Sequence, residues 1–259
     1  MRPIEELTAG ECSALRVIAS DIDDTMTLGA RLSGRTLHAL ERARDAGLSV
    51  VVVTGRPAGF VMALAAYLPG VDAVIGENGG VLAGPDSCQI LPAGDQDIAH
   101  LRERLAACHA DIAHEAPEAV TSGDTFARLT DHAYLVDGLS AATRSAIDRV
   151  AARHGFETSA SSIHVHVKLP GHTKGRALAR WLAARTPAVD HGQVLTVGDS
   201  ETDATLFDTN VFPLSVGVAN IERVLGRLAT PPAFVTRGRE GAGFVELLDW
   251  VLARRSSRA

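Results

Sequence analysis

Several things are scarce in this sequence, and each shortage excludes a class of protein. Among 259 residues there are three cysteines, which are widely spaced and odd in number, so neither a disulfide framework nor a zinc knuckle is indicated. No apolar run approaches the ~18 residues of a membrane span, and the opening residues MRPIEELTAGE have no apolar stretch typical of a signal peptide. We therefore expect a cytoplasmic protein with no membrane partner.

Positive charge is also scarce. The formal net charge is −6, and residues 85–168 hold most of the excess, with 12 acidic against 7 basic residues, whereas the rest of the chain has 19 against 18. A nucleic-acid backbone requires a basic patch, so this distribution argues against a nucleic-acid partner and favours a small-molecule substrate. Lysine is the rarest charged residue: the chain has two, Lys168 and Lys174, against 23 arginines. The oligomeric state is left open.

Both ends of the chain alternate between strand-like and helix-like segments. Residues 16–20 and 48–54 are apolar runs rich in β-branched residues, which is typical of strands buried on both faces. Between them, Ser33 can cap a helix that ends at Gly47, so the first unit is β-α-β and the sheet is predicted to be parallel. We predict an α/β fold, a Rossmann-like doubly wound sheet formed by residues 1–84 and 169–259.

The middle of the chain has a different pattern. It predicts helices over 95–114 and 140–154, with strands near 125–136 and 156–169. This order indicates a small α+β domain, residues 85–168, inserted into the core. Such an insertion is a natural cap over a site.

Unusual polar residues follow three predicted strands. In an open parallel sheet, ligands bind beyond the carboxyl ends of the strands, so these side chains should converge. They offer carboxylates for a hard cation, and hydroxyl and ammonium donors for an anion. Each motif alone also fits an ordinary turn or helix cap, but their shared position favours a site. The residues are Asp21, Asp23, Thr25, Thr54, Gly55, Arg56, Asp199 and Asp203, with Lys174 at the start of a predicted helix.

In this order the motifs resemble those of the haloacid dehalogenase superfamily phosphatases. They read D-I-D-D-T, V-V-T-G-R, H-T-K-G and V-G-D-S-E-T-D. The insertion between the second and third motifs, and Glu77-Asn78-Gly79, are similar to the Cof-type and sucrose-phosphatase-like branch. The spacing of GDSETD and the short cap are also similar to archaeal-type phosphoglycolate phosphatases. Asp24 departs from the pattern, because glycine is usual there.

The resemblance implies a magnesium-dependent phosphomonoesterase that works through an aspartyl-phosphate. Asp21 would be the nucleophile and Asp23 the general acid and base. Mg²⁺ would be held by Asp21, Asp199 and the backbone carbonyl of Asp23, with Asp203 orienting the metal site directly or through water. The phosphoryl oxygens would be bound by Thr54, Gly55 and Lys174. The expected substrate is a small phosphate ester, with a sugar phosphate as first choice and phosphoglycolate second.

Two other classes of function stay open. A signalling receiver also accepts a phosphoryl group on an aspartate, although the second aspartate and the large cap argue against it. A non-catalytic binding protein is disfavoured because no motif residue is missing, and phosphoglucomutase-like chemistry is less expected because those relatives usually place the cap differently. Prompt turnover of a small phosphate ester would separate an enzyme from the first two.

Four further residues are candidates for the substrate pocket. Arg56 and Asn78 could line it or could be turn residues. In SIHVHVKLP, strand alternation puts Ile163, Val165, Val167 and Leu169 on one face, and His164, His166 and Lys168 on the other. We expect the apolar face to pack on the two cap helices. The polar face then either meets solvent or recognises the leaving group through His164 and His166, whereas a zinc pair lacks a third ligand.

Overall fold

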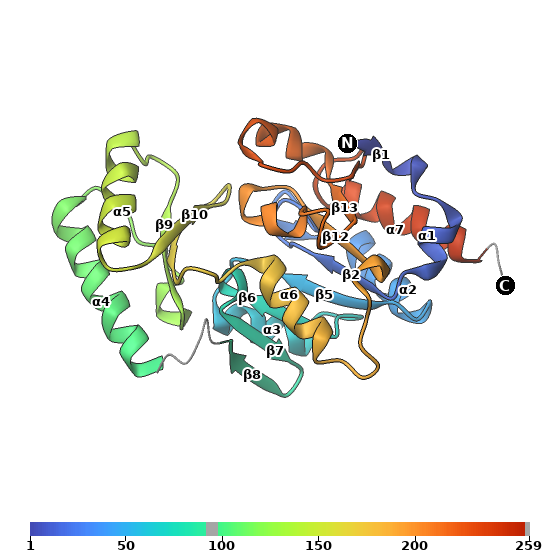
Figure 1. Cartoon of the computed structure of the whole chain (residues 1–259), viewed down its shortest axis with the longest axis horizontal. Helices are drawn as coiled ribbons and strands as arrows, with labels where there is room; N and C mark the ends of the chain where they lie inside the picture. The colour runs from blue at the N-terminus through green and yellow to red at the C-terminus, as the bar shows by residue number, and fades with distance from the viewer. Residues whose placement is uncertain (92–97, 257–259) are drawn as a thin grey trace.

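The computed structural model describes residues 1–91 and 98–256, and a nine-stranded sheet lies at its centre (Figure 1). The strand order is β1-β14-β13-β12-β2-β5-β6-β7-β8, and every pair from β1 to β6 is parallel. The parallel strands are β1 (Arg2–Pro3), β2 (Val17–Ser20), β5 (Ser49–Val53), β6 (Ala73–Gly76), β12 (Val194–Gly198), β13 (Leu214–Gly217) and β14 (Phe234–Val235).

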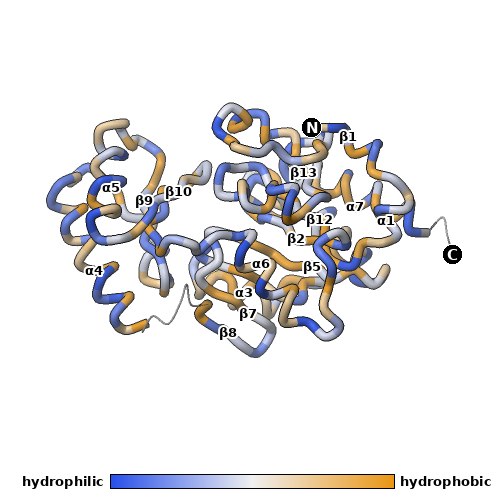
Figure 2. The backbone as a smooth tube through the Cα atoms, viewed as in Figure 1, coloured by the Kyte–Doolittle hydropathy of each residue, from blue (hydrophilic) through white to orange (hydrophobic). Residues whose placement is uncertain are grey.

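Helices cover both faces of this sheet. Along β5, Val50 and Val52 belong to one apolar cluster and Val51 and Val53 to the other, so successive side chains are buried on opposite faces. The strands in the middle of the molecule are accordingly hydrophobic in Figure 2. One face is covered by α1 (Ala9–Ala14), α2 (Gly34–Asp45), α3 (Ala58–Tyr67) and α7 (Glu240–Ser256), and the other by α6 (Lys174–Ala183) and short 3₁₀ segments.

A second, antiparallel sheet lies beside the core (Figure 1). It has the order β10-β11-β9, and one of its faces packs on α4 and α5. Val165, Val167 and Leu169 join this apolar cluster as predicted, but Ile163 does not. Residues 98–168 are called the cap below. They comprise α4 (Ile98–Glu115), β9 (Asp131–Leu135), α5 (Ala141–Arg153), β10 (Glu157–Ala160) and β11 (His164–Lys168).

Residue 85, the predicted start of the insertion, lies between two strands of the core sheet. The strands β7 (Val81–Gly84) and β8 (Ser87–Ile90) form a hairpin that extends the core sheet from β6. The turn residues Pro85 and Asp86 between them were the available signal for that hairpin. The chain therefore leaves the core sheet after Ile90, while the division into core and cap domains stays a prediction.

Other local differences concern the ends of elements. The helix predicted from residue 95 begins at Ile98 among the described residues, and its first three positions lie outside them. The helices predicted over 201–209 and 220–228 are short 3₁₀ segments: η5 (Glu201–Leu206), η6 (Ala219–Arg223) and η7 (Leu225–Arg227). The predicted strand near 125–136 is confined to β9, preceded by η3 (Thr125–Ala127).

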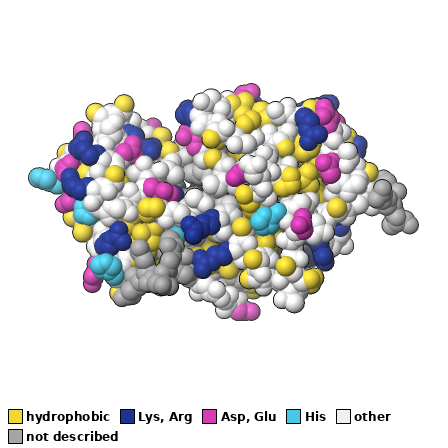
Figure 3. All heavy atoms as spheres, viewed as in Figure 1, with side chains coloured by type: hydrophobic (Ala, Val, Ile, Leu, Met, Phe, Trp, Pro, Cys, Tyr) yellow, Lys and Arg dark blue, Asp and Glu magenta, His cyan; other side chains and the backbone are white. Residues whose placement is uncertain are grey.

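The surface shows charges of both signs. Figure 3 shows basic and acidic side chains interspersed on the face in view. Within residues 1–91 and 98–256, no helix has the length and apolar character needed to cross a membrane. The cytoplasmic location, and the absence of nucleic-acid and membrane partners, stay predictions.

Candidate active site

Three carboxylates meet at the carboxyl edge of the core sheet. Asp21 follows β2 and Asp199 follows β12, and these strands are neighbours in the sheet. The Asp21 backbone N–H donates to Val197 O at 3.0 Å, which fixes the first of them against β12. Asp203 comes from η5. One carboxylate oxygen of each lies within 4.8 Å of the others, and all three residues are buried.

Lys174 brings the positive charge to this cluster. It begins α6, and its Nζ donates to Asp21 Oδ1 at 2.8 Å and to Asp203 Oδ1 at 2.7 Å. Its side chain is 1% exposed. Burial alone would lower the pKa of Lys174, but Asp203 and Asp21 hold that pKa above its usual value. The ammonium is therefore charged, and it offsets only part of the negative charge around it.

The remaining negative charge fits a divalent cation. Burial raises the pKa of Asp21 well above its usual value against the opposing effect of Lys174, and the other aspartates add to the rise. Burial, followed by repulsion from Asp203, raises the pKa of Asp199 to about 7. Lys174 is the one ammonium that contacts this cluster among the described residues, so three buried carboxylates have a single positive charge beside them. An all-oxygen set of this kind suits Mg²⁺.

Asp203 has both carboxylate oxygens occupied by protein donors. Oδ1 accepts from Lys174, and Oδ2 accepts from the backbone N–H of Asp199 at 3.0 Å and of Ser200 at 2.9 Å. The side chain lies against Gly198, where a Cβ would stand 2.5 Å from Asp203 Cγ, so only glycine fits there. Asp203 thus orients Asp199 and Lys174.

Asn220 is part of the site, although it was not identified from the sequence. Its Nδ2 donates to Asp199 Oδ2 at 2.8 Å and to the Asp24 carbonyl at 2.9 Å. Its Oδ1 accepts from the Glu240 backbone N–H at 2.8 Å. Thr25 Oγ1 donates to the other Asp199 oxygen at 3.0 Å. Asn220 follows β13, so the rule of polar residues at strand ends could have found it.

The segment after β5 contributes the other side of the site. Thr54 is buried, and its Oγ1 accepts from the Arg56 backbone N–H at 3.2 Å. The Arg56 guanidinium donates from Nε to Asp23 Oδ2 at 2.8 Å and from Nη2 to Asp23 Oδ1 at 2.6 Å. Asp23, the candidate general acid, therefore forms a bidentate ion pair with Arg56.

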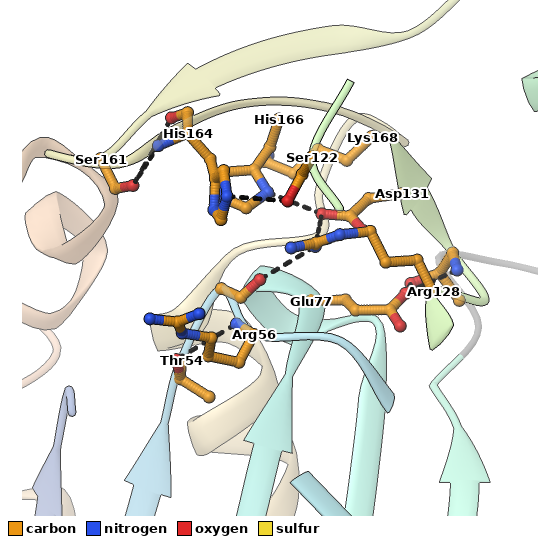
Figure 4. A network of polar contacts seen from close by, with 12 residues as sticks. Thr54, Arg56, Glu77, Ser122, Arg128, Asp131, Ser161, His164, His166 and Lys168 are labelled. Carbon is orange, nitrogen blue, oxygen red and sulfur yellow. Dashed lines mark hydrogen bonds and ion pairs between the residues drawn. The ribbon is translucent and has the colours of Figure 1, made fainter. Parts of the chain in front are cut away.

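The cap histidines lie over this segment (Figure 4). His166 Nδ1 is 2.8 Å from Asp131 Oδ2, and its Nε2 would be 3.0 Å from a Cβ at Gly55, so glycine makes room for it. His164 and His166 are 6% and 1% exposed, which contradicts the alternative of a solvated face. Lys168 on the same strand is also buried and pairs with Glu157.

Burial is the main cause that lowers the pKa of both His164 and His166. It lowers the pKa of His164 to about 4, and it lowers the pKa of His166 despite the Asp131 carboxylate. With Asp131 accepting from Nδ1, the Nε2 of a neutral His166 is a hydrogen-bond acceptor.

Buried polar contacts join the cap to the core. Arg128 donates from Nη1 to the Gly55 carbonyl at 3.0 Å and to Asp131 Oδ1 at 2.9 Å (Figure 4). Glu77 accepts from the backbone N–H groups of Leu129 at 2.9 Å and Thr130 at 2.6 Å. Burial, with a contribution from Asp131, raises the pKa of Glu77 to about 7. These contacts join the cap to the core beside the site.

The closed arrangement leaves a cavity of about 20 Å³ between core and cap. A water molecule needs about 10–15 Å³ by this measure, so only one or two waters fit. Asn78 lines the cavity and is 2% exposed, and neither side-chain polar atom has a partner among the described residues. The predicted residues that line this cavity are Asp21, Asp23, Gly55, Arg56, Asn78, His164, His166, Lys174 and Asp199. Thr54 and Asp203 do not line it, but they are hydrogen-bonded to Arg56 and Lys174, which do.

Comparison with known proteins identifies the family. The sequence model of the haloacid dehalogenase-like hydrolases matches residues 18–110. A phosphoglycolate phosphatase of Pyrobaculum neutrophilum is 34% identical over 244 residues, which are 92% of this chain and 96% of that protein. The chain belongs to the haloacid dehalogenase-like hydrolases. The predicted family is confirmed, and this hydrolase is a phosphatase.

Solved structures confirm the fold of this hydrolase. A crystal structure from Thermoplasma acidophilum matches with a TM-score of 0.72 at 20% identity, covering 92% of this chain and 98% of that one. The sucrose-phosphatase of Synechocystis sp. PCC6803 matches with a TM-score of 0.65 at 17% identity, covering 91% and 97%. Both show that the predicted α/β architecture is correct.

Proposed function

We propose that this hydrolase is a magnesium-dependent phosphomonoesterase whose substrate is a small carboxylated phosphate ester, with phosphoglycolate as first choice. The observation that carries the reaction is Asp21, held beside Lys174 and Asp199 at the edge of the sheet. The described cavity of about 20 Å³ must enlarge to admit any phosphate ester, so it does not set the size of the substrate. The choice of phosphoglycolate rests on the Pyrobaculum relative, for which it is the named substrate.

The chemistry is a transfer to Asp21 followed by hydrolysis. A carboxylate oxygen of Asp21 attacks phosphorus, the bond to the ester oxygen breaks, and Asp23 gives that oxygen its proton. Water then attacks the phosphorus of the aspartyl-phosphate and passes a proton back to Asp23. This step releases inorganic phosphate and restores the Asp21 carboxylate.

The other residues bind and orient. Lys174 and Thr54 bind the phosphoryl oxygens, together with the backbone at Gly55. Asp21, Asp199 and the backbone carbonyl of Asp23 would hold Mg²⁺, which when bound supplies positive charge that offsets the negative charge of the phosphoryl group. Closure of the cap excludes bulk water from the first step. The cavity must enlarge to admit a substrate, so opening of the cap belongs to the cycle.

A sugar phosphate, preferred from the sequence alone, is the second candidate. His166 lines the cavity, and its Nε2 could bind a sugar hydroxyl. Both phosphoglycolate and a hexose phosphate require a more open cap than the one described, and the larger hexose phosphate requires the larger opening.

Steady-state rates on a panel of esters test the proposal. Phosphoglycolate, a hexose phosphate, a disaccharide phosphate and p-nitrophenyl phosphate are compared with Mg²⁺ and with EDTA, for the parent and for Asp21→Asn. We expect the highest kcat/KM for phosphoglycolate, loss of activity in EDTA that Mg²⁺ restores, and no turnover by Asp21→Asn. A higher kcat/KM for a sugar phosphate would refute the substrate, and full activity after chelation would refute the metal site.

A further inference from the structure

A second cavity adjoins the one at Asp21, between the cap sheet and the core. Its volume is about 160 Å³, and Asn78, Lys174 and Thr202 line both cavities. A water molecule takes up about 30 Å³ of liquid, so the second cavity has room for about five waters. It is therefore much larger than the cavity in which the proposed chemistry takes place.

One face of the cap sheet lines both cavities. Glu157 of β10 pairs with Lys168 of β11. Ser159 pairs with His166 in the same way, and residues directly opposite each other in an antiparallel pair share a face of the sheet. His166 lines the first cavity, whereas Lys168, farther along the same strand (Figure 4), lines the second together with Glu157 and Ser159. The polar face of β11 thus continues from the reacting groups into the second cavity.

Several polar groups that line the second cavity have no hydrogen-bond partner among the described residues. Asn78 is 2% exposed, and both polar atoms of its side chain are unpartnered, as is the buried Oγ of Ser159. His172 is 3% exposed, and its ring interacts with the Leu91 backbone, which leaves at least one ring nitrogen without a partner. Buried polar groups are normally hydrogen-bonded, because an unpaired one costs free energy. Their gathering around one cavity indicates a polar ligand.

The charged groups that line this cavity are already paired. Lys168 pairs with Glu157, which lines the same cavity. Lys174 pairs with two aspartates, and Glu201 pairs with an arginine. A charged ligand would have to displace one of these pairs, whereas an uncharged polar ligand leaves all of them intact. The pairing therefore favours an uncharged group.

Hydroxyl groups match the unpartnered atoms. The Asn78 amide has both N–H donors and an acceptor oxygen, and the Ser159 hydroxyl can donate and accept. A ligand hydroxyl also donates and accepts, whereas a carboxylate only accepts and would leave Asn78 Oδ1 unpaired. Glycerol, with about six non-hydrogen atoms, is close in size to the room for about five waters.

We propose that the second cavity binds the hydroxyl groups of the leaving alcohol, so that phosphate esters of short polyols, such as glycerol 3-phosphate, are a second substrate class of this phosphatase. This inference rests on the proposed function and adds to phosphoglycolate rather than replacing it. The phosphoryl group passes to Asp21, and the polyol leaves with the ester oxygen and a proton. Water then releases inorganic phosphate from Asp21.

The test compares glycerol 3-phosphate with propyl phosphate, which has the same carbon chain without the hydroxyl groups. Ser159→Ala removes the unpartnered hydroxyl of β10, and His172→Phe removes the ring nitrogens but keeps an aromatic ring. The matched control is Ser13→Ala in α1, because Ser13 Oγ is also buried without a partner among the described residues but lines neither cavity. Thermal melting of each variant shows whether it is folded.

We expect the parent to have a kcat/KM at least about tenfold higher for glycerol 3-phosphate than for propyl phosphate, because propyl phosphate leaves buried polar groups unpaired. Ser159→Ala should lower kcat/KM for glycerol 3-phosphate about 3- to 10-fold, which is the range for loss of one hydrogen bond between uncharged groups. It should lower the value for propyl phosphate by a smaller factor. His172→Phe should act in the same direction, and Ser13→Ala should match the parent on both esters.

Equal kcat/KM values for the two esters in the parent, or equal losses on both in a folded Ser159→Ala variant, would overturn the proposed subsite. Calorimetry with Asp21→Asn separates this result from the proposed reaction. That variant should bind glycerol 3-phosphate at least about tenfold more tightly than propyl phosphate, and adding Ser159→Ala should reduce the difference. If the parent hydrolyses no ester with Mg²⁺, the proposed function fails, and equal Kd values for the two esters would then overturn the subsite as well.

Discussion

Replacement of Lys174 by methionine gives the sharpest test of how the acidic cluster is stabilised. Methionine fills nearly the same space, so the change removes the ammonium while keeping most of the packing. Asp21 and Asp203 then lose a charged partner that is 1% exposed. Removing one member of a buried ion pair costs about 3–5 kcal/mol, which corresponds to a fall in Tm of about 6–20 °C for a chain of this size.

The loss should depend on pH and on Mg²⁺. Burial already raises the pKa of Asp21 in the folded protein, and loss of Lys174 removes the charge that opposes this rise, so the unfavourable contribution of the Asp21 carboxylate grows as pH rises. The destabilisation of Lys174→Met in EDTA should therefore be larger at about pH 7.5 than at about pH 5.5. Mg²⁺ should return more stability to the variant than to the parent, because the cation replaces the missing positive charge.

Urea unfolding at both pH values, with EDTA and with Mg²⁺, measures these differences. The other lysine provides the control, because Lys168 is also buried but pairs with Glu157, whose side chain is 40% exposed. Lys168→Met should cost less, and its loss should not respond to Mg²⁺. A loss below about 1 kcal/mol in EDTA for Lys174→Met, or one that neither pH nor Mg²⁺ changes, would refute this account of the cluster.

Two further predictions concern the same edge of the sheet. Asp24 has φ +55 and accepts from Ser162 Oγ at the cap. Asp24→Gly should raise the free energy of unfolding by about 1 kcal/mol, because glycine relieves the left-handed strain, and it should also raise KM, whereas Ser162→Ala should raise KM alone. An unchanged KM in both variants would show that this contact has no part in cap closure. The second concerns the metal. Burial raises the pKa of Asp199 to about 7 and also raises that of Asp21, so calorimetry should show the Kd for Mg²⁺ rising at least about tenfold for each pH unit below 7. A Kd independent of pH would refute the competition between Mg²⁺ and protons.

The core of the site was predictable because a parallel sheet fixes where its strand ends lie. Asp21 and Asp199 are far apart in the chain, but they follow β2 and β12, which are neighbours in the sheet. The rule that ligands bind beyond the carboxyl ends of parallel strands was therefore enough to predict that these two residues lie close together. Lys174 was predictable for a related reason, since a cation at a helix start requires an anion.

The contacts between cap and core were not predictable in the same way. Strand alternation separated His164 and His166 from the apolar face of β11, but it left open whether they meet solvent. The hydrogen bond from Arg128 to the Gly55 carbonyl, and those from the backbone of residues 129–130 to Glu77, depend on how the separately packed cap and core meet. No periodic pattern records that arrangement, because each of these charged residues also fits a solvated surface.

Closure of the cap and the chemistry of the core use the same short segments. Arg128 of the cap binds the carbonyl of Gly55, whose neighbours in the chain are Thr54 and Arg56. The backbone of Thr130 binds Glu77, which directly precedes Asn78 of the cavity. In the proposed mechanism, a displaced cap therefore releases the segments that position the phosphoryl group and the general acid. A substrate that fails to allow closure loses catalytic geometry as well as protection from water, which is how a small cap can select among phosphate esters.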